Sequence, residues 1–330
     1  MSPIRWSSEF RLLAQRYADR VAVVDEKGYA TYGEIFARAA GIARALIDLG
    51  VDSRTCVATC FRNGTDAVAA TFSVMASGAT EVPLNPALST ADRDHCLAVS
   101  NTRIVLTTSR LAGDLAGSDR RIICVDDIAP ANFDREDFPA SAADDPARII
   151  FTSGTTGKPK GAIHTQRGRW IANLLLCGSL PYRLSSKNRV LLMTPYSHGA
   201  SLLTHAYLSS GASVCLLDGV DTDKVLQVLE AGSCDAMFAP PTVLAKIVSA
   251  IDAERRPKPL QTIYCGTAPL KAELYARARS IFGPIVRITY GKSEIVNPIT
   301  VLEPDDTDAC YASVDENTCV GYPAAGVEIA

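Results

Sequence analysis

The 330-residue chain lacks the features that would assign it at once to a nucleic-acid-binding or membrane class. Its formal net charge is only -3, so the composition gives no reason to expect nucleic acid or an anionic membrane surface as a partner. No stretch approaches the roughly 18 apolar residues of a membrane helix, and the first residues contain no apolar segment typical of a signal peptide. We therefore expect a cytoplasmic protein with no nucleic acid and no membrane as partner.

Patterns of disulfides and metal sites are also missing. The ten cysteines are scattered, none form a Cys-x-x-Cys pair, and several lie inside apolar runs. This favours buried reduced thiols over disulfides or zinc ligands. The 47% of hydrophobic and 21% of charged residues are those of an ordinary globular chain, and we find no repeats and no low-complexity tract.

The sequence does contain an alternation of short apolar strands and amphipathic helices. Thr31 and Glu34 form a capping-box pattern for a helix that we expect to reach Leu49, before Gly50. Strands separated by helices of about 10–15 residues predict an α/β fold with mostly parallel sheets. The stretch 129–146, rich in Ala, Asp and Pro, is the best candidate for a linker. We therefore expect a first α/β subdomain over residues 1–145 and a second over residues 146–300.

A dense cluster of polar residues follows the apolar run Ile149 to Phe151. Its glycines let backbone N–H groups turn toward an anion, its hydroxyls add donors and its lysines neutralise charge. This predicts a polyphosphate site. It is not a Walker A loop, because no Gly-Lys-Ser/Thr ends it and Pro159 stands where the helix would begin, which disfavours a P-loop kinase or hydrolase. The residues concerned are Thr152, Ser153, Gly154, Thr155, Thr156, Gly157, Lys158 and Lys160.

Ten residues, Thr152 to Gly161 (Thr-Ser-Gly-Thr-Thr-Gly-Lys-Pro-Lys-Gly), resemble the signature of the adenylate-forming superfamily. That family includes acyl- and aryl-CoA synthetases, luciferases and peptide-synthetase adenylation domains. Segments 31–36, 75–88 and 320–329 resemble further motifs of the family. The resemblance implies two αβα subdomains with mostly parallel sheets, as in the family's N-terminal domain, with the start of a small β-barrel over residues 301–330. The chain stops before the family's C-terminal domain, which we expect to be absent from it.

The segment from Thr194 to His198 resembles a family motif whose histidine lies at the mouth of the carboxylate site and can act as a gate. By family position, the acyl pocket would be lined by His198, Gly199, Ala200, Ser201, Leu202, Gly291 and Ile295. The stretch after His198 carries no charge. A hydrophobic or aryl carboxylic acid therefore fits better than an amino acid or a diacid.

Two further strand ends resemble nucleotide-binding elements of the family. Gly266, Thr267, Ala268 and Pro269 resemble the element whose backbone lies against adenine, and we expect a helix from Leu270 to Phe282 after it. Tyr290-Gly-Lys-Ser-Glu294 resembles the Tyr-Gly-x-Thr-Glu motif, with Ser293 in place of Thr. The resemblance implies that Tyr290 and Gly291 meet adenine, Ser293 the α-phosphate and Glu294 a Mg²⁺ ion. Ligands bind at this edge of parallel sheets.

The resemblance implies an AMP-forming acid–thiol ligase that uses ATP and Mg²⁺. A carboxylate attacks the α-phosphorus of ATP, and a thiol, usually of coenzyme A, then takes the acyl group. The residues expected to act in catalysis are Lys158, Lys160, His198 and Glu294. Two other interpretations stay open: an adenylation domain that loads a carrier protein thiol, and a nucleotide- or adenylate-binding domain without catalysis. The second arises because the chain as given is expected to be incomplete for full turnover.

Overall fold

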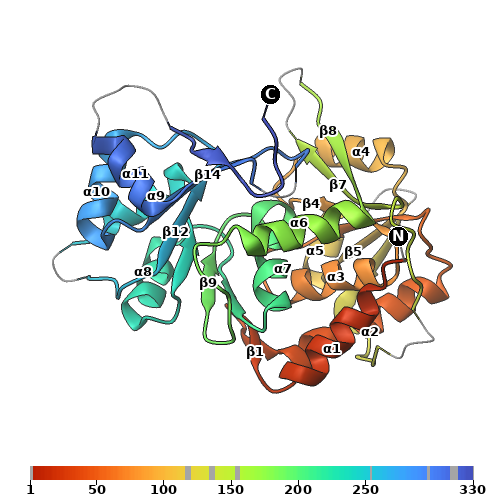
Figure 1. Ribbon diagram of the computed structural model, residues 1–330. Helices are drawn as coiled ribbons and strands as arrows, with labels where there is room; N and C mark the ends of the chain where they lie inside the picture. Colours follow the sequence, from red (N-terminus) through yellow and green to blue (C-terminus); the bar gives the residue numbers. More distant parts are fainter. Residues whose placement is uncertain are drawn as a thin grey trace. The chain divides into compact units, whose positions relative to one another are not determined.

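The computed structural model describes residues 3–115, 120–133, 138–152, 157–252, 255–295, 298–312 and 319–329. Figure 1 shows the helices and strands of the chain, which divides into two compact units. Unit 1 comprises Met1–Ile171 and Pro195–Leu202, and unit 2 comprises Ala172–Thr194 and Leu203–Ala330. The polypeptide passes between the units three times, so neither is a single continuous segment.

Unit 1 contains a sheet in the order β6-β5-β3-β4-β7-β8, in which only β7 and β8 pair antiparallel. The predicted division at residue 145 falls inside this unit, because β7 pairs with β4 in the same sheet. In the same unit, β1 and β2 pair with each other in antiparallel orientation. The strands are β1 (Val21–Asp25), β2 (Gly28–Thr31), β3 (Cys56–Cys60), β4 (Thr80–Leu84), β5 (Ile104–Thr107), β6 (Arg121–Cys124), β7 (Pro146–Thr152) and β8 (Lys160–Thr165).

Three helices of unit 1 pack around an aromatic core. Phe10, Phe36 and Phe72 come from three different helices, and their ring centroids lie 4.9–5.4 Å apart. The predicted capping box is confirmed: Glu34 N donates to Thr31 Oγ1 at 3.2 Å, and Thr31 N donates to Glu34 Oε2 at 2.7 Å. The helices of this unit are α1 (Trp6–Tyr17), α2 (Tyr32–Asp48), α3 (Thr65–Ala76), α4 (Thr90–Val99) and α5 (Ser109–Ala112).

Side chains of β3 and β4 alternate between two faces of the sheet. On one face, Ala58 and Val82 join the hydrophobic cluster that includes Cys96 and Leu97 of α4. On the other face, Glu81 accepts a 2.6 Å hydrogen bond from the Thr71 hydroxyl of α3. One face therefore packs against an apolar cluster, whereas the α3 face holds a buried charge.

Unit 2 contains strands in the order β15-β14-β13-β12-β11-β9-β10, parallel from β10 to β13, with β14 and β15 added antiparallel. The α/β fold with two mostly parallel sheets is thus confirmed, whereas the start of a β-barrel at residue 301 stays a prediction. The strands are β9 (Arg189–Leu192), β10 (Ser213–Leu216), β11 (Ala236–Phe238), β12 (Thr262–Gly266), β13 (Val286–Tyr290), β14 (Thr300–Leu302) and β15 (Tyr322–Pro323).

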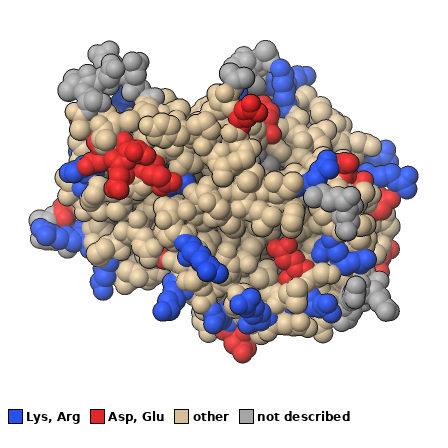
Figure 2. Space-filling model, viewed as in Figure 1, with Lys and Arg blue, Asp and Glu red and all other residues tan. Residues whose placement is uncertain are grey.

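In unit 2, α8 packs on α9 and α9 on α10, beside β12 and β13. Figure 2 shows acidic side chains gathered over α11, whose first turn carries Asp305 and Asp306, as the helix dipole favours. α6 begins in unit 1 and ends in unit 2. None of the described helices has both the length and the apolar character needed to span a bilayer. The remaining helices are α6 (Gln166–Gly178), α7 (Ser201–Ser209), α8 (Thr222–Ala231), α9 (Pro241–Ala250), α10 (Ala272–Phe282) and α11 (Pro304–Ala312).

Candidate functional site

The glycine- and lysine-rich segment of unit 1 connects β7 to β8. These strands pair antiparallel, so that Thr152 lies opposite Lys160. A Cβ atom on Gly161 would lie only 2.7 Å from Cγ2 of Ile149, so glycine permits the close approach of the two strands here. Four predicted phosphate-binding residues, Ser153, Gly154, Thr155 and Thr156, lie outside the described residues.

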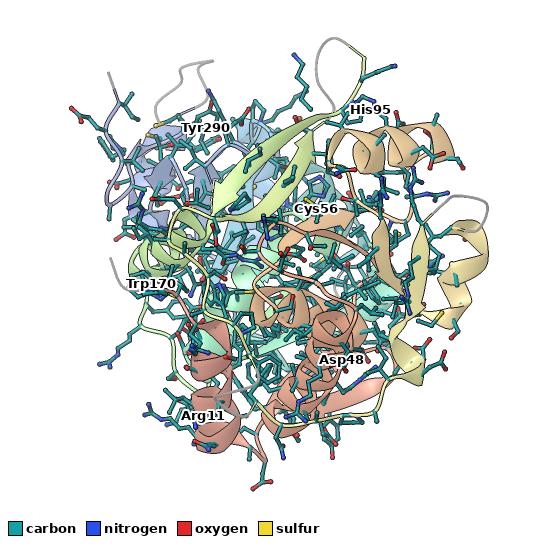
Figure 3. The ribbon with its side chains drawn as sticks, turned by 90° about the vertical axis from the view of Figure 1, so that its right-hand side faces the viewer. Arg11, Asp48, Cys56, His95, Trp170 and Tyr290 are labelled. Atoms are coloured by element: carbon teal, nitrogen blue, oxygen red, sulfur yellow. The ribbon has the colours of Figure 1, made fainter. Side chains whose placement is uncertain are left out.

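The described end of this connection presents its charges to solvent. Lys158 and Lys160 are both exposed. Between them, the carbonyl oxygen of Pro159 lies 3.0 Å from Nε2 of His95, which stands on α4 beside the hairpin (Figure 3). Two exposed ammonium groups beside a glycine-rich connection can neutralise an anionic ligand.

The predicted gate, His198, also belongs to unit 1. It lies in the π-helical turn η3 (Tyr196–Ala200), where its φ of -123° and ψ of -135° break the helical path. Tyr196 N donates to Asn63 Oδ1 at 2.8 Å, and Ser201 Oγ donates to the His198 carbonyl at 2.7 Å. The turn is therefore anchored at both ends. The predicted acyl-pocket residues Gly199 to Leu202 form the rest of this turn and the start of α7, with Ala200 fully buried.

The imidazole of His198 is held in an environment that disfavours its charged form. Its Nδ1 shares a 2.9 Å hydrogen bond with Ser197 Oγ. Although His198 as a residue is exposed, desolvation by the surrounding protein lowers its pKa, and the positive charge of Arg148 lowers the pKa further. A neutral imidazole is the form expected at neutral pH.

In unit 2, the two predicted nucleotide elements emerge side by side from neighbouring strands. β12 and β13 are parallel, with Gly266 opposite Thr289. The chain is buried through Gly266, and Thr267, Ala268 and Pro269 are exposed beyond it. A Cβ on Gly266 would lie 2.6 Å from the Thr289 carbonyl oxygen, so any other residue would push the strands apart.

The backbone after Gly266 is strained. Thr267 has φ of +71°, a left-handed conformation that β-branched residues rarely adopt and that is found mainly where function requires it. The helix expected from Leu270 begins two residues later, at Ala272. The segment Gly266 to Pro269 thus forms a backbone ledge at the carboxyl edge of the sheet, buried at Gly266 and exposed from Thr267 to Pro269.

Beside this ledge, β13 ends at Tyr290, which is 40% exposed (Figure 3). Gly291, Glu294 and Ile295 are also exposed, and Ser293 is partly buried. An exposed ring next to an accessible backbone suits the stacking of a planar base. The structure therefore brings together Gly266–Pro269 and Tyr290–Ile295 within unit 2, and Lys158, Lys160 and His198–Leu202 belong to unit 1.

Glu294 is a single carboxylate. In the described part of the chain, no three His, Cys, Asp or Glu residues gather as a metal site. Mg²⁺ binds with few protein carboxylates and keeps phosphate oxygens and waters as ligands, so a lone exposed Glu294 fits a metal bound together with a nucleotide.

Three residues that the sequence analysis did not single out form a charged cluster in the interior of unit 1. Glu81, Arg148 and Arg169 are only 0%, 1% and 5% exposed. The available signal was a charge beside apolar strand residues, since Glu81 directly precedes Val82, and Arg148 lies between Ala147 and Ile149.

Comparison with known proteins identifies the family of the chain. The model of the family described as "AMP-binding enzyme" matches residues 10–330. The chain belongs to the AMP-binding enzyme family. This confirms the predicted membership of the adenylate-forming superfamily, because the match covers both the β7–β8 connection and the edge of β12 and β13.

Relatives of this AMP-binding chain include two kinds of enzyme. The chain is 28% identical over 97% of its length to the probable non-canonical nonribosomal peptide synthetase CymA of Salinispora arenicola, but spans 4% of that protein. It is 28% identical over 96% of its length to the 4-chlorobenzoate–CoA ligase of Arthrobacter sp, and spans 65% of that enzyme. A structure of o-succinylbenzoate CoA synthetase from Bacillus subtilis, bound with a product analogue, matches with a TM-score of 0.84 and 25% identity, over 98% of this chain and 64% of that one.

Proposed function

We propose that the chain provides the site at which ATP activates a carboxylic acid to an acyl-adenylate, followed by transfer of the acyl group to coenzyme A. The observation that carries this proposal is the carboxyl edge of β12 and β13, where the Gly266–Pro269 ledge and the exposed Tyr290 lie on adjacent strands. Adenine stacks on Tyr290 and lies along the ledge, with Gly291 beside it. Ser293 donates its hydroxyl to the α-phosphate.

The remaining residues hold and neutralise charge. Thr152 to Gly157, with Lys158 and Lys160, bind the pyrophosphate limb of ATP. Mg²⁺, when bound by Glu294 with phosphate oxygens and water, supplies positive charge that stabilises the reacting phosphate. The chain contributes positioning and charge neutralisation, and no protein nucleophile is needed, because the substrate carboxylate itself attacks phosphorus.

The acid is a hydrophobic or aryl carboxylate. His198 stands at its carboxylate, and the uncharged segment Gly199–Leu202 lines its acyl group. The small and fully buried Ala200 supports an apolar pocket wall. The similarity to 4-chlorobenzoate–CoA ligase supports both an aryl acid and coenzyme A.

A second candidate function is the loading of a carrier protein thiol. It is favoured by the similarity to the peptide synthetase CymA, which extends over 97% of this chain. The two functions share the adenylation half-reaction and differ only in the acceptor thiol.

The test is ATP–pyrophosphate exchange with a full-length version of the protein across a panel of benzoates, fatty acids and amino acids, followed by thioester formation with coenzyme A or a phosphopantetheinyl carrier protein. We expect exchange with aryl or hydrophobic acids, and a loss of about 10²–10³-fold in Glu294→Gln. Glu273→Gln is the control, because Glu273 is an exposed carboxylate at the start of α10 in the same unit. No exchange with any acid, or equal exchange in Glu294→Gln, would count against the proposal.

A further inference from the structure

The charged cluster of unit 1 is assembled from three elements. Glu81 on β4 and Arg148 on β7 are direct partners in the register of the two strands, and Arg148 Nε lies 3.4 Å from Glu81 Oε2. Arg169, on α6, places NH1 3.2 Å from the same oxygen. The other carboxylate oxygen accepts hydrogen bonds from the hydroxyls of Thr71 at 2.6 Å and Thr59 at 3.2 Å.

The cluster holds one positive charge more than neutrality requires. One carboxylate faces two guanidinium groups, and all three residues are buried. In the described part of the chain, Arg148 Nε and NH1 and Arg169 NH1 make no hydrogen bond. Burying an uncompensated charge is costly, and one arginine would suffice to pair Glu81. The second guanidinium therefore needs a reason other than neutralising Glu81.

Arg148 connects the charged cluster to the turn that contains His198. Its NH2 donates to Ser201 Oγ at 2.8 Å, and Ser201 Oγ donates in turn to the His198 carbonyl oxygen at 2.7 Å. β4, which carries Glu81, packs against η3 as well. A continuous path of ion pairs and hydrogen bonds thus joins the buried carboxylate to the backbone of His198, all within unit 1.

We propose that Arg148 is a positioning residue that fixes the turn presenting His198 through Ser201, and that Glu81 and Arg169 hold Arg148 in place for this task. The inference rests on the proposed role of His198 at the substrate carboxylate. The guanidinium also disfavours a positive imidazole nearby, because like charges repel. His198 then contacts the substrate carboxylate as a neutral group, so that no ion pair forms between the two.

The test is an NMR pH titration of the His198 ring in the full chain, assigned by comparison with His198→Gln. The charged groups on the elements of the cluster are Glu81 of β4, Arg148 of β7, and the buried Arg169 and exposed Arg167 of α6. In Arg148→Met, Glu81 and Arg169 remain as a one-to-one pair, so the fold should persist. We expect the titration midpoint of His198 to rise in this variant, because the positive charge of Arg148 no longer opposes protonation of the ring. Arg148→Lys should keep it near the wild-type value.

Ser201→Ala isolates the hydrogen-bond path. It should increase amide hydrogen exchange in residues 196–200 while moving the titration midpoint little. If Arg148→Met does not fold, the amide hydrogen exchange of Ser201→Ala still tests the inference. Arg167→Met is the matched control, since Arg167 is an exposed arginine of α6 paired with Asp144, and it should change neither readout.

An unchanged His198 midpoint in folded Arg148→Met, or unchanged exchange in Ser201→Ala, would overturn the inference. Both readouts are independent of turnover. If they change as expected while the full-length wild-type protein shows no ATP–pyrophosphate exchange, then the proposed function fails and the positioning of His198 by Arg148 stands.

Discussion

The carboxyl edge of β12 and β13 in unit 2 and the charged cluster in unit 1 are built by different means. The edge is made largely of backbone, from two short segments that each follow a strand, and most of its residues are exposed. The cluster is made of side chains from β4, β7 and α6, and its residues are buried. Residues at the edge must be accessible to bind a ligand. In the buried cluster, removing one charged partner leaves the others without compensation, which is costly. Substitutions in the cluster should therefore change stability most, and substitutions at the edge should change binding most.

Glu81→Gln should have the largest effect on stability. It leaves two buried guanidinium groups with no carboxylate, and breaking a buried ion pair in this way costs about 3–5 kcal/mol. The free energy of unfolding from a urea titration measures it. A loss below about 1 kcal/mol would mean that the cluster is far better solvated than its exposure indicates.

Thr71→Val tests the same buried carboxylate, Glu81, through the pH dependence of stability. Burial alone would raise the pKa of Glu81, but the charges of Arg148 and Arg169 and the hydrogen bonds from Thr71 and Thr59 together hold the pKa below its ordinary value. A lowered pKa in the folded state stabilises the protein above the unfolded-state pKa of about 4.3, and this stabilisation is lost as the pH falls through the folded-state pKa.

Removing the Thr71 hydroxyl should cost about 1.5–3 kcal/mol at neutral pH, because its hydrogen bond goes to a charged group. The stability lost on acidification below about pH 4.3 should then be smaller than in the wild type, because the folded-state pKa of Glu81 lies closer to its unfolded-state value. Urea titrations at pH 7 and at several acidic values measure both effects. Parallel stability–pH curves for the two proteins would contradict this.

Gly266→Ala tests the edge. The added Cβ would meet the Thr289 carbonyl at 2.6 Å, and forcing an atom into a packed site costs about 1–3 kcal/mol. Gly178→Ala is the matched control in the same unit, since its added Cβ would contact nothing within 4 Å. Thermal unfolding of both variants should separate them, and equal melting temperatures would show that β12 and β13 can move apart freely.

Arg167→Met should have the smallest effect on the free energy of unfolding. This exposed arginine pairs with the exposed Asp144, and such pairs contribute about 0–1 kcal/mol. Its loss of stability, measured by urea titration, should be well below that of Glu81→Gln and should shrink further in 0.5 M salt. A loss comparable to that of Glu81→Gln would remove the distinction between buried and exposed charge in unit 1.

The same contrast explains what the sequence could predict. Strand–helix alternation, the Thr31–Glu34 capping box and the segments at Gly266 and Tyr290 are local patterns, each contained in a few consecutive residues. The cluster depends on the pairing of β4 with β7, which joins Glu81 to a residue far along the chain. β8 was not expected either, because its segment Lys160–Thr165 includes Lys and Gly, which are poor strand formers, and it becomes a strand by pairing with β7.

The most direct test of the proposed site is calorimetric titration with a non-hydrolysable acyl-sulfamoyl-adenosine. The wild-type chain should bind it, and Tyr290→Ala should weaken binding by about 10- to 100-fold, since stacking of a base on an aromatic ring contributes about 1–3 kcal/mol. Tyr322→Ala is the control, because Tyr322 is an exposed tyrosine on β15 of the same unit. Binding that is absent in the wild type, or equally tight in Tyr290→Ala, would contradict an adenylate site at the edge of β12 and β13.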